Sequence, residues 1–216
     1  MNWKPLFAGL LAAGLLSGCA SNVNAPATLP AVDPQPVVET SAPTSVTVNS
    51  AQELAAAIAP GATITLGEGV FKLDLGDDIN TGNPYCWWEA VEDGFQLVIS
   101  GVQDLTIQGA GRDATRIQTD PRFADVLKFE NCGNLTLRGF TAGHTVQAEG
   151  WEADVIDLGD CQNVLLEDLG LFGCGFIGIN ASQCQGLNIR TCDIYSCSGT
   201  GIVLSYVKDC KVTGCT

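Results

Sequence analysis

The sequence predicts an all-β fold in which short parallel strands stack coil upon coil along one axis. Hydrophobic residues make up 46% of the 216 residues and charged residues 16%, with 25 glycines and 9 prolines, a composition that favours strands and turns. One short phrase recurs along the chain, and its apolar residues alternate with polar ones at a period of two, as in a strand. The intervals between copies leave no room for a crossover helix, so neighbouring copies must stack directly.

The repeated phrase occurs in five copies, whose starts lie 30, 29, 23 and 23 residues apart. The copies are LVISGVQDLTI (97–107), LKFENCGNLTL (127–137), IDLGDCQNVLL (156–166), INASQCQGLNI (179–189) and IVLSYVKDCKV (202–212). Alignment of the copies gives four apolar columns. The first column contains Leu97, Leu127, Ile156, Ile179 and Ile202. Each copy therefore predicts two short strands separated by a turn, with like residues stacked about 4.8 Å apart inside the solenoid.

The phrase is clearest as Asn-Leu-Thr-Leu at 134–137 and Asn-Val-Leu-Leu at 163–166. On these motifs, residues 46–216 resemble the superfamily of pectate lyases, polygalacturonases and copper-enzyme maturation proteins. The resemblance implies a single-stranded right-handed parallel β-helix, and it makes carbohydrate the expected partner.

The segment before the first copy predicts a strand at 45–48 and then a short amphipathic helix at 51–59. Ser50 and Glu53 form a capping box at its start, and Pro60-Gly61 ends it. By the resemblance, this helix covers the N-terminal end of the solenoid. Strands are expected at 63–66 and 70–73, followed by an excursion without repeat character at 74–94. The chain stops inside a coil, which predicts an incomplete or uncapped C-terminal end.

The first 44 residues predict an export signal and a tether. A single cation, Lys4, precedes the apolar run 6–16, which has the length of a signal-peptide core. The run ends in Leu-Ser-Gly-Cys at 16–19, which resembles the lipobox of bacterial lipoproteins and predicts a signal peptide at 1–18 and a lipid on Cys19. The alternative is a buried or disulfide-bonded Cys19. Residues 19–44 predict a disordered Pro/Ala/Thr-rich tether, and 45–216 the β-helix domain.

Charge narrows the choice of partners. Acidic residues outnumber Lys and Arg by 24 to 10, which gives a net charge of −14 and excludes a phosphate-backbone interface with nucleic acid. Membrane contact is expected through the lipid anchor only, and the predicted location is the bacterial cell envelope. A polyanionic sugar would need a basic groove or bridging calcium, so a neutral glycan is physically easier. The oligomeric state stays open.

Most cysteines follow the repeat. Cys132, Cys161 and Cys184 share one column with Val102 and Val207, which predicts buried thiols that fill the core like small hydrophobic side chains. Two further columns are predicted. They contain Cys174 with Cys197, and Cys192 with Cys215. Disulfides between neighbouring coils remain an alternative, whereas no pair of CxxC motifs favours zinc. Cys86, outside the repeat, is expected to be the exposed thiol.

The candidate site is the outer face of the first strand in each coil, beside the loop that enters it. In the resembling enzymes the active groups lie there, and in this chain that face collects in-register carboxylates with the only histidine and aromatic residues. The expected catalytic residues are Asp154, Asp157 and His144. The expected substrate-binding residues are Asp125, Lys128, Trp151, Trp87 and Trp88. Stacked carboxylates can raise one another's pKa or chelate calcium, whereas no dedicated metal site is predicted.

Three classes of function remain open. The chain lacks the Trp-x-Asp-His phrase of pectate lyases, and it lacks the Asp-Asp pair and Gly-His-Gly of polygalacturonases. An acidic protein also places aspartate on any exposed strand face. The sequence therefore allows a polysaccharide lyase or glycoside hydrolase, a non-catalytic glycan-binding or surface-structural protein, or a periplasmic scaffold.

Overall fold

The computed structural model describes residues 44–73, 82–145, 153–173 and 176–216. The predicted signal peptide, Cys19 and nearly all of the predicted tether lie outside the described residues, as do Trp151 and Cys174. Within the described ranges, no helix is long and apolar enough to cross a membrane.

The described chain is built from short strands and one helix. In chain order, these elements are β1 (Ser45–Val48), α1 (Ala51–Ala57), β2 (Thr63–Leu66), β3 (Gly69–Lys72), β4 (Cys86–Val91), β5 (Gly94–Ser100), β6 (Thr106–Gln108), β7 (Thr115–Thr119), β8 (Leu127–Glu130), β9 (Thr136–His144), β10 (Ile156–Gly159), β11 (Gln162–Phe172), β12 (Ile177–Ser182), β13 (Gln185–Arg190), β14 (Asp193–Tyr195), β15 (Thr200–Ser205) and β16 (Lys211–Thr213).

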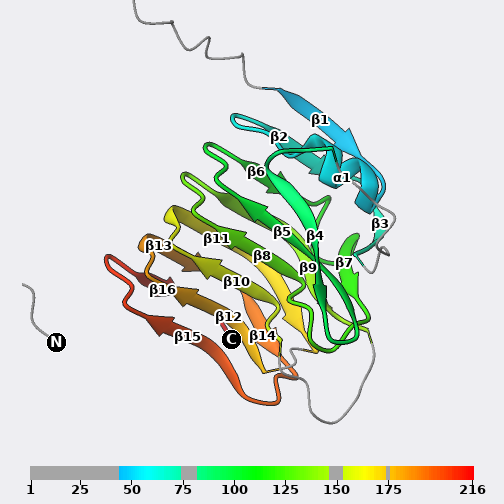
Figure 1. The fold of residues 1–216 in the computed structure, drawn as a ribbon. Coiled ribbons are helices and arrows are strands. Elements are labelled where there is room, and N and C mark those ends of the chain that lie inside the picture. Colours follow the sequence, from blue (N-terminus) through cyan, green and yellow to red (C-terminus); the bar gives the residue numbers. More distant parts are fainter. Residues whose placement is uncertain (1–43, 74–81, 146–152, 174–175) are drawn as a thin grey trace, which may run out of the picture. The chain divides into compact units, whose positions relative to one another are not determined.

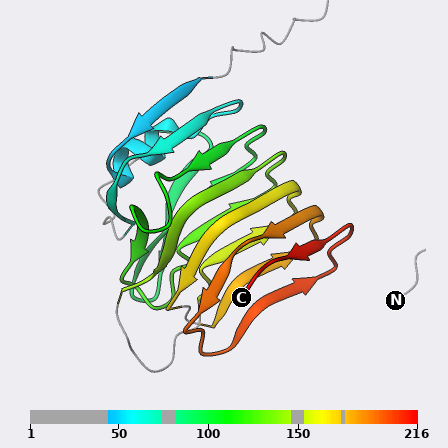
Figure 2. The same ribbon diagram turned by 180° about the vertical axis from the view of Figure 1, so that it is seen from behind.

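Two sheets form the walls of a β-helix (Figure 1). The first wall is a six-stranded sheet in the order β15-β12-β10-β8-β5-β4, parallel except for the antiparallel pair β4 and β5. The second wall contains the path β1-β2-β6-β9-β11-β13-β16, and it is parallel throughout. Seen from behind, the strands again lie side by side in the colour order of the chain (Figure 2). An all-β fold with parallel sheets is confirmed.

A third wall completes each coil, and the sequence phrase did not predict it. Strands β9 and β11 bend at Gly139 and Asp168, whose φ angles are +68° and +52°. Their second halves pair with β7 and β14 as a separate row of strands, and β3 pairs with β7. The bend arises because left-handed backbone turns the strand direction within one residue.

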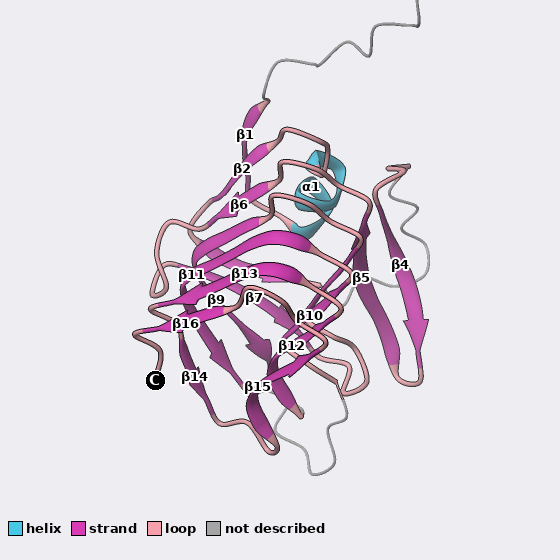
Figure 3. Ribbon diagram, turned by 90° about the vertical axis from the view of Figure 1, so that its left-hand side faces the viewer, coloured by secondary structure: helices cyan, strands magenta, loops and turns pink. Residues whose placement is uncertain are grey.

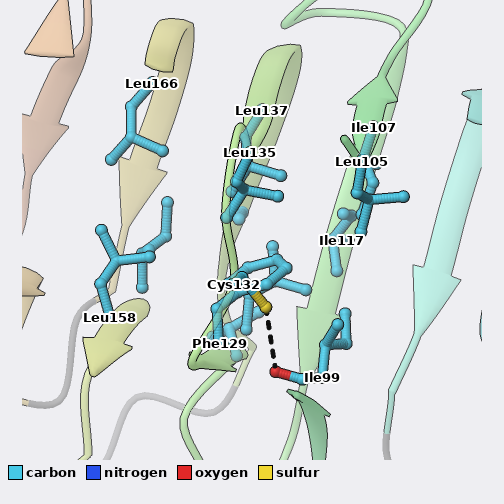
Figure 4. Packing of buried hydrophobic residues seen from close by; sticks show 14 of the residues in the cluster. Ile99, Leu105, Ile107, Ile117, Phe129, Cys132, Leu135, Leu137, Leu158 and Leu166 are labelled. Atoms are coloured by element: carbon cyan, nitrogen blue, oxygen red, sulfur yellow. Dashed lines mark hydrogen bonds between the residues drawn. The ribbon is translucent and has the colours of Figure 1, made fainter. Parts of the chain in front are cut away.

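The register confirms the predicted alignment. Leu127, Ile156, Ile179 and Ile202 are paired one coil to the next, as the first apolar column requires. Side chains of the other columns also face the interior, where Ile107, Leu137 and Leu166 are completely buried (Figure 4). Burial of these stacked aliphatic side chains is the main favourable contribution to folding.

The turns between walls use left-handed backbone at regular positions. One column of such residues runs Asp104, Asn134, Asn163, Gly186 and Asp209. Asn134 Nδ2 donates to Asp104 Oδ1 at 2.7 Å, and Asn163 Nδ2 donates to Asn134 Oδ1 at 3.0 Å. These three side chains therefore form a ladder along the turn between the first and second walls. Asn and Asp tolerate this conformation better than other non-glycine residues, which explains the Asn that opens the repeated motif.

The cysteine prediction is confirmed for the first column. Cys132, Cys161 and Cys184 are free thiols and are buried in the core. Cys132 Sγ lies 3.7 Å from the carbonyl oxygen of Ile99 in the preceding coil (Figure 4). Cys197 is disulfide-bonded, so the alternative of a disulfide holds at that position.

The N-terminal segment differs from its prediction in the helix, which ends at Ala57 rather than at 59, and in the excursion that follows. The side chain of Ser50 accepts from the backbone N–H of Glu53, as predicted, and α1 lies at the N-terminal end of the stack (Figure 3). The excursion, however, contains the regular strand β4, which forms a hairpin with β5. Cys86 begins this strand and is 1% exposed, so its prediction as an exposed thiol is wrong. Its thiol lies inside because residue 86 of the hairpin faces α1, where Sγ contacts the carbonyl oxygen of Ala55 at 3.2 Å.

Candidate functional site

The outer face of the first wall brings together most of the predicted site residues. Because Leu127 and Phe129 are buried, the alternation along β8 turns Lys128 outward. One row of paired residues crosses five strands on this face. It contains Trp87, Val98, Lys128, Asp157 and Asn180. We call the surface formed by Asp125, Lys128, Asp154 and Asp157, with Glu89, Gln96, Glu130 and Asn180, the acidic face.

Asp125 and Asp154 are linked one coil to the next. The backbone N–H of Asp154 donates to Asp125 Oδ1 at 2.8 Å, and Asn180 Nδ2 donates to Asp154 Oδ2 at 2.9 Å. Gln96 Oε1 accepts from the backbone N–H of Asp125 at 2.9 Å. Both carboxyl groups are therefore held in fixed positions at the entrance to the first-wall strands.

Burial and mutual repulsion raise the pKa values of these carboxyl groups toward neutral pH. Burial raises the pKa of Asp125 to about 7, and the charges of Asp157 and Asp154 add to the increase. Burial also raises the pKa of Asp154 to about 6, with a contribution from Asp157. The pKa of Asp157 is raised by burial and by Glu130, although Lys128 opposes the change. The face can therefore hold a proton at neutral pH.

Lys128 is the cation of this face. Its Nζ lies 3.4 Å from Glu89 Oε2 and 3.5 Å from Glu130 Oε1. Burial would lower the pKa of Lys128, but the charge of Glu89, followed by those of Glu130 and Asp125, raises it. Lys128 pairs with Asp157 in the backbone register, as the alignment of the copies at 127–137 and 156–166 requires, yet its ammonium group contacts the two glutamates.

Sequence reasoning missed several members of the acidic face, among them the Glu89 and Gln96 pair of the hairpin. Glu89 lies on β4, and its carboxylate accepts from Gln96 Nε2 at 2.6 Å. The pair is opposite in the antiparallel register of β4 and β5. The signal was present as two apolar segments separated by the short turn at Glu92 and Asp93, a hairpin pattern outside the repeat.

His144 lies inside the coil rather than on the acidic face. It is 3% exposed, with Nε2 2.8 Å from the carbonyl oxygen of Ala124 and Nδ1 3.1 Å from that of Gly173. Burial lowers the pKa of His144. The imidazole thus connects the end of the third wall to the start of the first wall, and it borders the site from the interior.

The aromatic residues are divided between the surface and the core. Trp87 is 41% exposed in the row of Lys128 and Asp157, whereas Trp88 packs against the core and its Nε1 has no hydrogen-bond partner. Trp151 lies outside the described residues. Phe176, which sequence reasoning missed, is 54% exposed and directly precedes β12, and its backbone N–H donates to the Ala153 carbonyl beside Asp154.

Within the described part of the chain, no three or more His, Cys, Asp or Glu side chains are grouped so that they could hold a metal ion. Asp125 Oδ1 and Asp154 Oδ2 are already occupied by N–H donors. Calcium binding at the acidic face therefore stays a prediction.

The comparisons with known proteins establish similarity of fold. No protein-family model and no curated protein matches the chain. A candidate glycosyl hydrolase from Parabacteroides merdae superposes with a TM-score of 0.54 at 13% identity, over 80% of this chain and 75% of that one. A pectate lyase from Paenibacillus superposes with a TM-score of 0.54 at 15% identity, over 73% of this chain but only 38% of the lyase. The chain thus shares its parallel β architecture with carbohydrate-active proteins.

Proposed function

We propose that the acidic face binds a neutral glycan and hydrolyses a glycosidic bond. The observation that carries the proposal is the cluster of Asp125, Asp154 and Asp157, in which two pKa values are raised to about 7 and about 6. Glycoside hydrolysis uses one carboxylic acid to protonate the leaving oxygen and one carboxylate as base or nucleophile. Carboxyl groups whose environments separate their pKa values can divide these roles.

The contacts support an assignment of the roles. Asp125 is the proton donor, since it is desolvated, has the higher pKa and accepts the Asp154 backbone N–H at Oδ1. Asp154 is also desolvated, and it accepts from Asn180 and from the backbone of Ile177, so it holds Asp125 in place and contributes less to proton transfer. Asp157 acts as the ionised carboxylate, because it is more exposed than Asp154 and the charge of Lys128 favours its ionised form. His144 is left out of this mechanism because its ring nitrogens face backbone carbonyls.

The balance of charge supports a neutral substrate. Five carboxyl groups face one ammonium group here, and the two glutamates already engage Lys128. A polyanionic sugar would meet repulsion in this field, whereas a neutral sugar would lose little. Trp87 offers an exposed indole to the apolar face of a sugar ring at one end of the row. The similarity of fold to a candidate glycosyl hydrolase agrees with this substrate class.

A non-catalytic glycan-binding protein is the second candidate. It is favoured by the burial of Asp154, which is 8% exposed. A carboxyl group buried this deeply can have a purely structural role, in which it orients Asn180 and the strands of the first wall. In that case Trp87 contributes to affinity and the aspartates contribute little.

Export and architecture complete the proposal. The chain is exported and lipid-anchored at Cys19 in the cell envelope, as the Leu-Ser-Gly-Cys motif supports. The coils wind right-handed, as parallel crossovers almost always do, and α1 covers the N-terminal end. The anchor is tested by Cys19→Ser, which should release soluble protein or block processing. Unchanged detergent partitioning of that variant would refute the anchor.

Release of reducing ends from a panel of neutral and acidic polysaccharides tests the function. Asp157→Asn keeps the shape and should lower the rate on a neutral glycan by about 100-fold or more, the scale of a lost acid or base. Asp209→Asn is the matched control, since Asp209 is exposed on the turn ladder away from the acidic face. If the parent protein binds a glycan without hydrolysing it, and Trp87→Ala weakens this binding, the protein is a non-catalytic glycan-binding protein. If Asp157→Asn and Trp87→Ala both hydrolyse and bind every glycan as the parent does, the acidic face is not the functional site.

A further inference from the structure

A hollow separate from the acidic face lies where the second wall bends into the third. It has a volume of about 360 Å³ and is lined by Gln108 to Gly111, Arg138, Gly139, Glu167 and Asp168. In the next coils, the column of Gly139 carries the side chains of Asp168 and Thr191. A Cβ atom on Gly139 would touch only the backbone of Gly109, at 3.4 Å and beyond, and one on Gly111 would meet nothing within 4 Å. Missing side chains thus leave the space open.

Hydrogen bonds and ion pairs hold the polar groups around this hollow. Gln108 Oε1 accepts from Arg138 Nε at 3.2 Å and from Nη2 at 2.6 Å. Glu167 Oε1 pairs with Arg190 Nη2 at 2.8 Å, and Asp168 Oδ1 pairs with Arg112 Nε at 3.1 Å. These contacts fix the orientation of the groups before any ligand arrives, which lowers the entropic cost of binding.

The chemistry of the lining selects a neutral ligand rich in hydroxyl groups. The lining holds one guanidinium group, that of Arg138, and the two carboxylates of Glu167 and Asp168, which are neutralised by Arg190 and Arg112 next to the hollow. A phosphate would meet the carboxylates of Glu167 and Asp168, and a cation would meet the guanidinium of Arg138. Apart from Ala110, no apolar side chain lines the hollow, which disfavours a hydrophobic ligand. Planar amide, guanidinium and carboxylate groups that keep free donors and acceptors suit sugar hydroxyls.

We propose that this hollow is a second, non-catalytic sugar-binding site for a neutral oligosaccharide, on walls other than the one that carries the acidic face. The proposal rests on the proposed function only in taking the ligand to be a sugar. A second site would hold a polymeric glycan against the outside of the solenoid while the acidic face acts on another segment, and it would raise the effective concentration of that segment.

The test fills the hollow without unfolding the coil. Gly139→Asn suits the left-handed backbone, and its side chain would enter the open space. Gly214→Asn is the matched control, because it has the same conformation in another coil, with φ of +63° and the nearest atom 3.6 Å from a Cβ. The whole chain carrying Trp87→Ala and Asp157→Asn is titrated with tetramers of neutral hexose, N-acetylhexosamine and pentose, with a galacturonate tetramer, and with inorganic phosphate.

The expected result is that a neutral tetramer shifts the backbone NMR signals of residues 108–111 and 139. Gly139→Asn and Arg138→Ala should each weaken this binding at least 10-fold, and Gly214→Asn should not change it. The proposal would be overturned if no neutral tetramer binds, or if phosphate or galacturonate shifts the same signals equally. It would also be overturned if Gly139→Asn leaves the affinity for the tetramer unchanged. Hydrolysis that still depends on Asp157 would then leave the proposed function standing. Binding in the hollow by a chain without hydrolytic activity would reject only the proposed function.

Discussion

At the scale of single residues, the buried cysteines add weak contacts to turn carbonyl groups that already accept a backbone N–H from the neighbouring coil. Cys161 Sγ lies 3.3 Å from the carbonyl oxygen of Gly159 and 3.6 Å from that of Phe129 in the preceding coil. Cys132 and Cys184 make the same two kinds of contact. A thiol is apolar enough for the core and still a weak donor, which a valine is not. The column therefore uses cysteine where a small residue meets buried carbonyls.

Substitution of Cys161 separates the contributions of volume and polarity. Cys161→Val should lower the free energy of unfolding by about 1.5 kcal/mol or less, because the volume is similar and Val102 fills the same column fully buried. Cys161→Asp should unfold the domain, since an unpaired buried carboxyl group removes several kcal/mol from a stability of about 5–15 kcal/mol. Urea denaturation measures both. A folded Asp variant with parental stability would remove residue 161 from the core.

The raised pKa of Asp125 predicts a stability that depends on pH. Below pH 4 this carboxyl group is protonated in both the folded and the unfolded chain. Between about pH 4 and 7 the unfolded chain ionises first, because folding raises the pKa of Asp125 to about 7. The folded state therefore loses stability as pH rises through this window. Asp125→Asn, whose Oδ1 can still accept from Asp154, should raise Tm at pH 8 and change it little at pH 4. An equal change at both values would contradict the predicted linkage.

At the scale of elements, α1 and β4 are connected by side chains that satisfy the end of the helix. Asn83 Nδ2 donates to the carbonyl oxygens of Ala55 and Ile58 at 2.8 and 2.7 Å, and Asn83 Oδ1 accepts from the backbone N–H of Tyr85. A seven-residue helix has little stability of its own. These contacts, together with burial of Leu54, therefore keep α1 in place and fix the start of the hairpin that supplies Glu89.

Substitution of Asn83 tests this connection. Asn83→Asp keeps the acceptor for Tyr85 but loses the two donated bonds and places a negative charge at the helix C-terminus, where it is unfavourable. It should therefore destabilise the protein at least as much as Asn83→Ala, and both by about 1–3 kcal/mol, the scale of unsatisfied buried carbonyls. Urea denaturation gives the difference. Parental stability of the Asp variant would show that the helix end does not depend on Asn83.

At the scale of the whole molecule, the predictable part of the fold is the part that repeats. Apolar columns predict which residues face inward, so the register and the pairing of Lys128 with Asp157 follow from alignment alone. The third wall has no such signal, because its strands are short and begin at single left-handed residues such as Gly139. The position of His144 was also hidden, since one histidine has no column to give its direction. Glu89 could not be predicted from the repeat either, because it lies on an antiparallel hairpin outside the repeated phrase.

The arrangement of coils finally predicts where the structure opens first. In a solenoid each coil is stabilised by its neighbours, so a strand paired on one side only should open more easily than one paired on both. Among the described strands, β15 and β16 are each paired on one side only, and their apolar residues Leu204 and Val212 are each 43% exposed. Hydrogen exchange followed by mass spectrometry should show faster exchange in β15 and β16 than in β8, β9 and β10. Uniform exchange along the chain would mean that the coils unfold only as one unit.

The same argument predicts how core substitutions depend on their place in the stack. Leu166 lies in the middle of the stack and is fully buried, so Leu166→Ala should destabilise the protein by about 2–5 kcal/mol. Leu204→Ala should change stability much less.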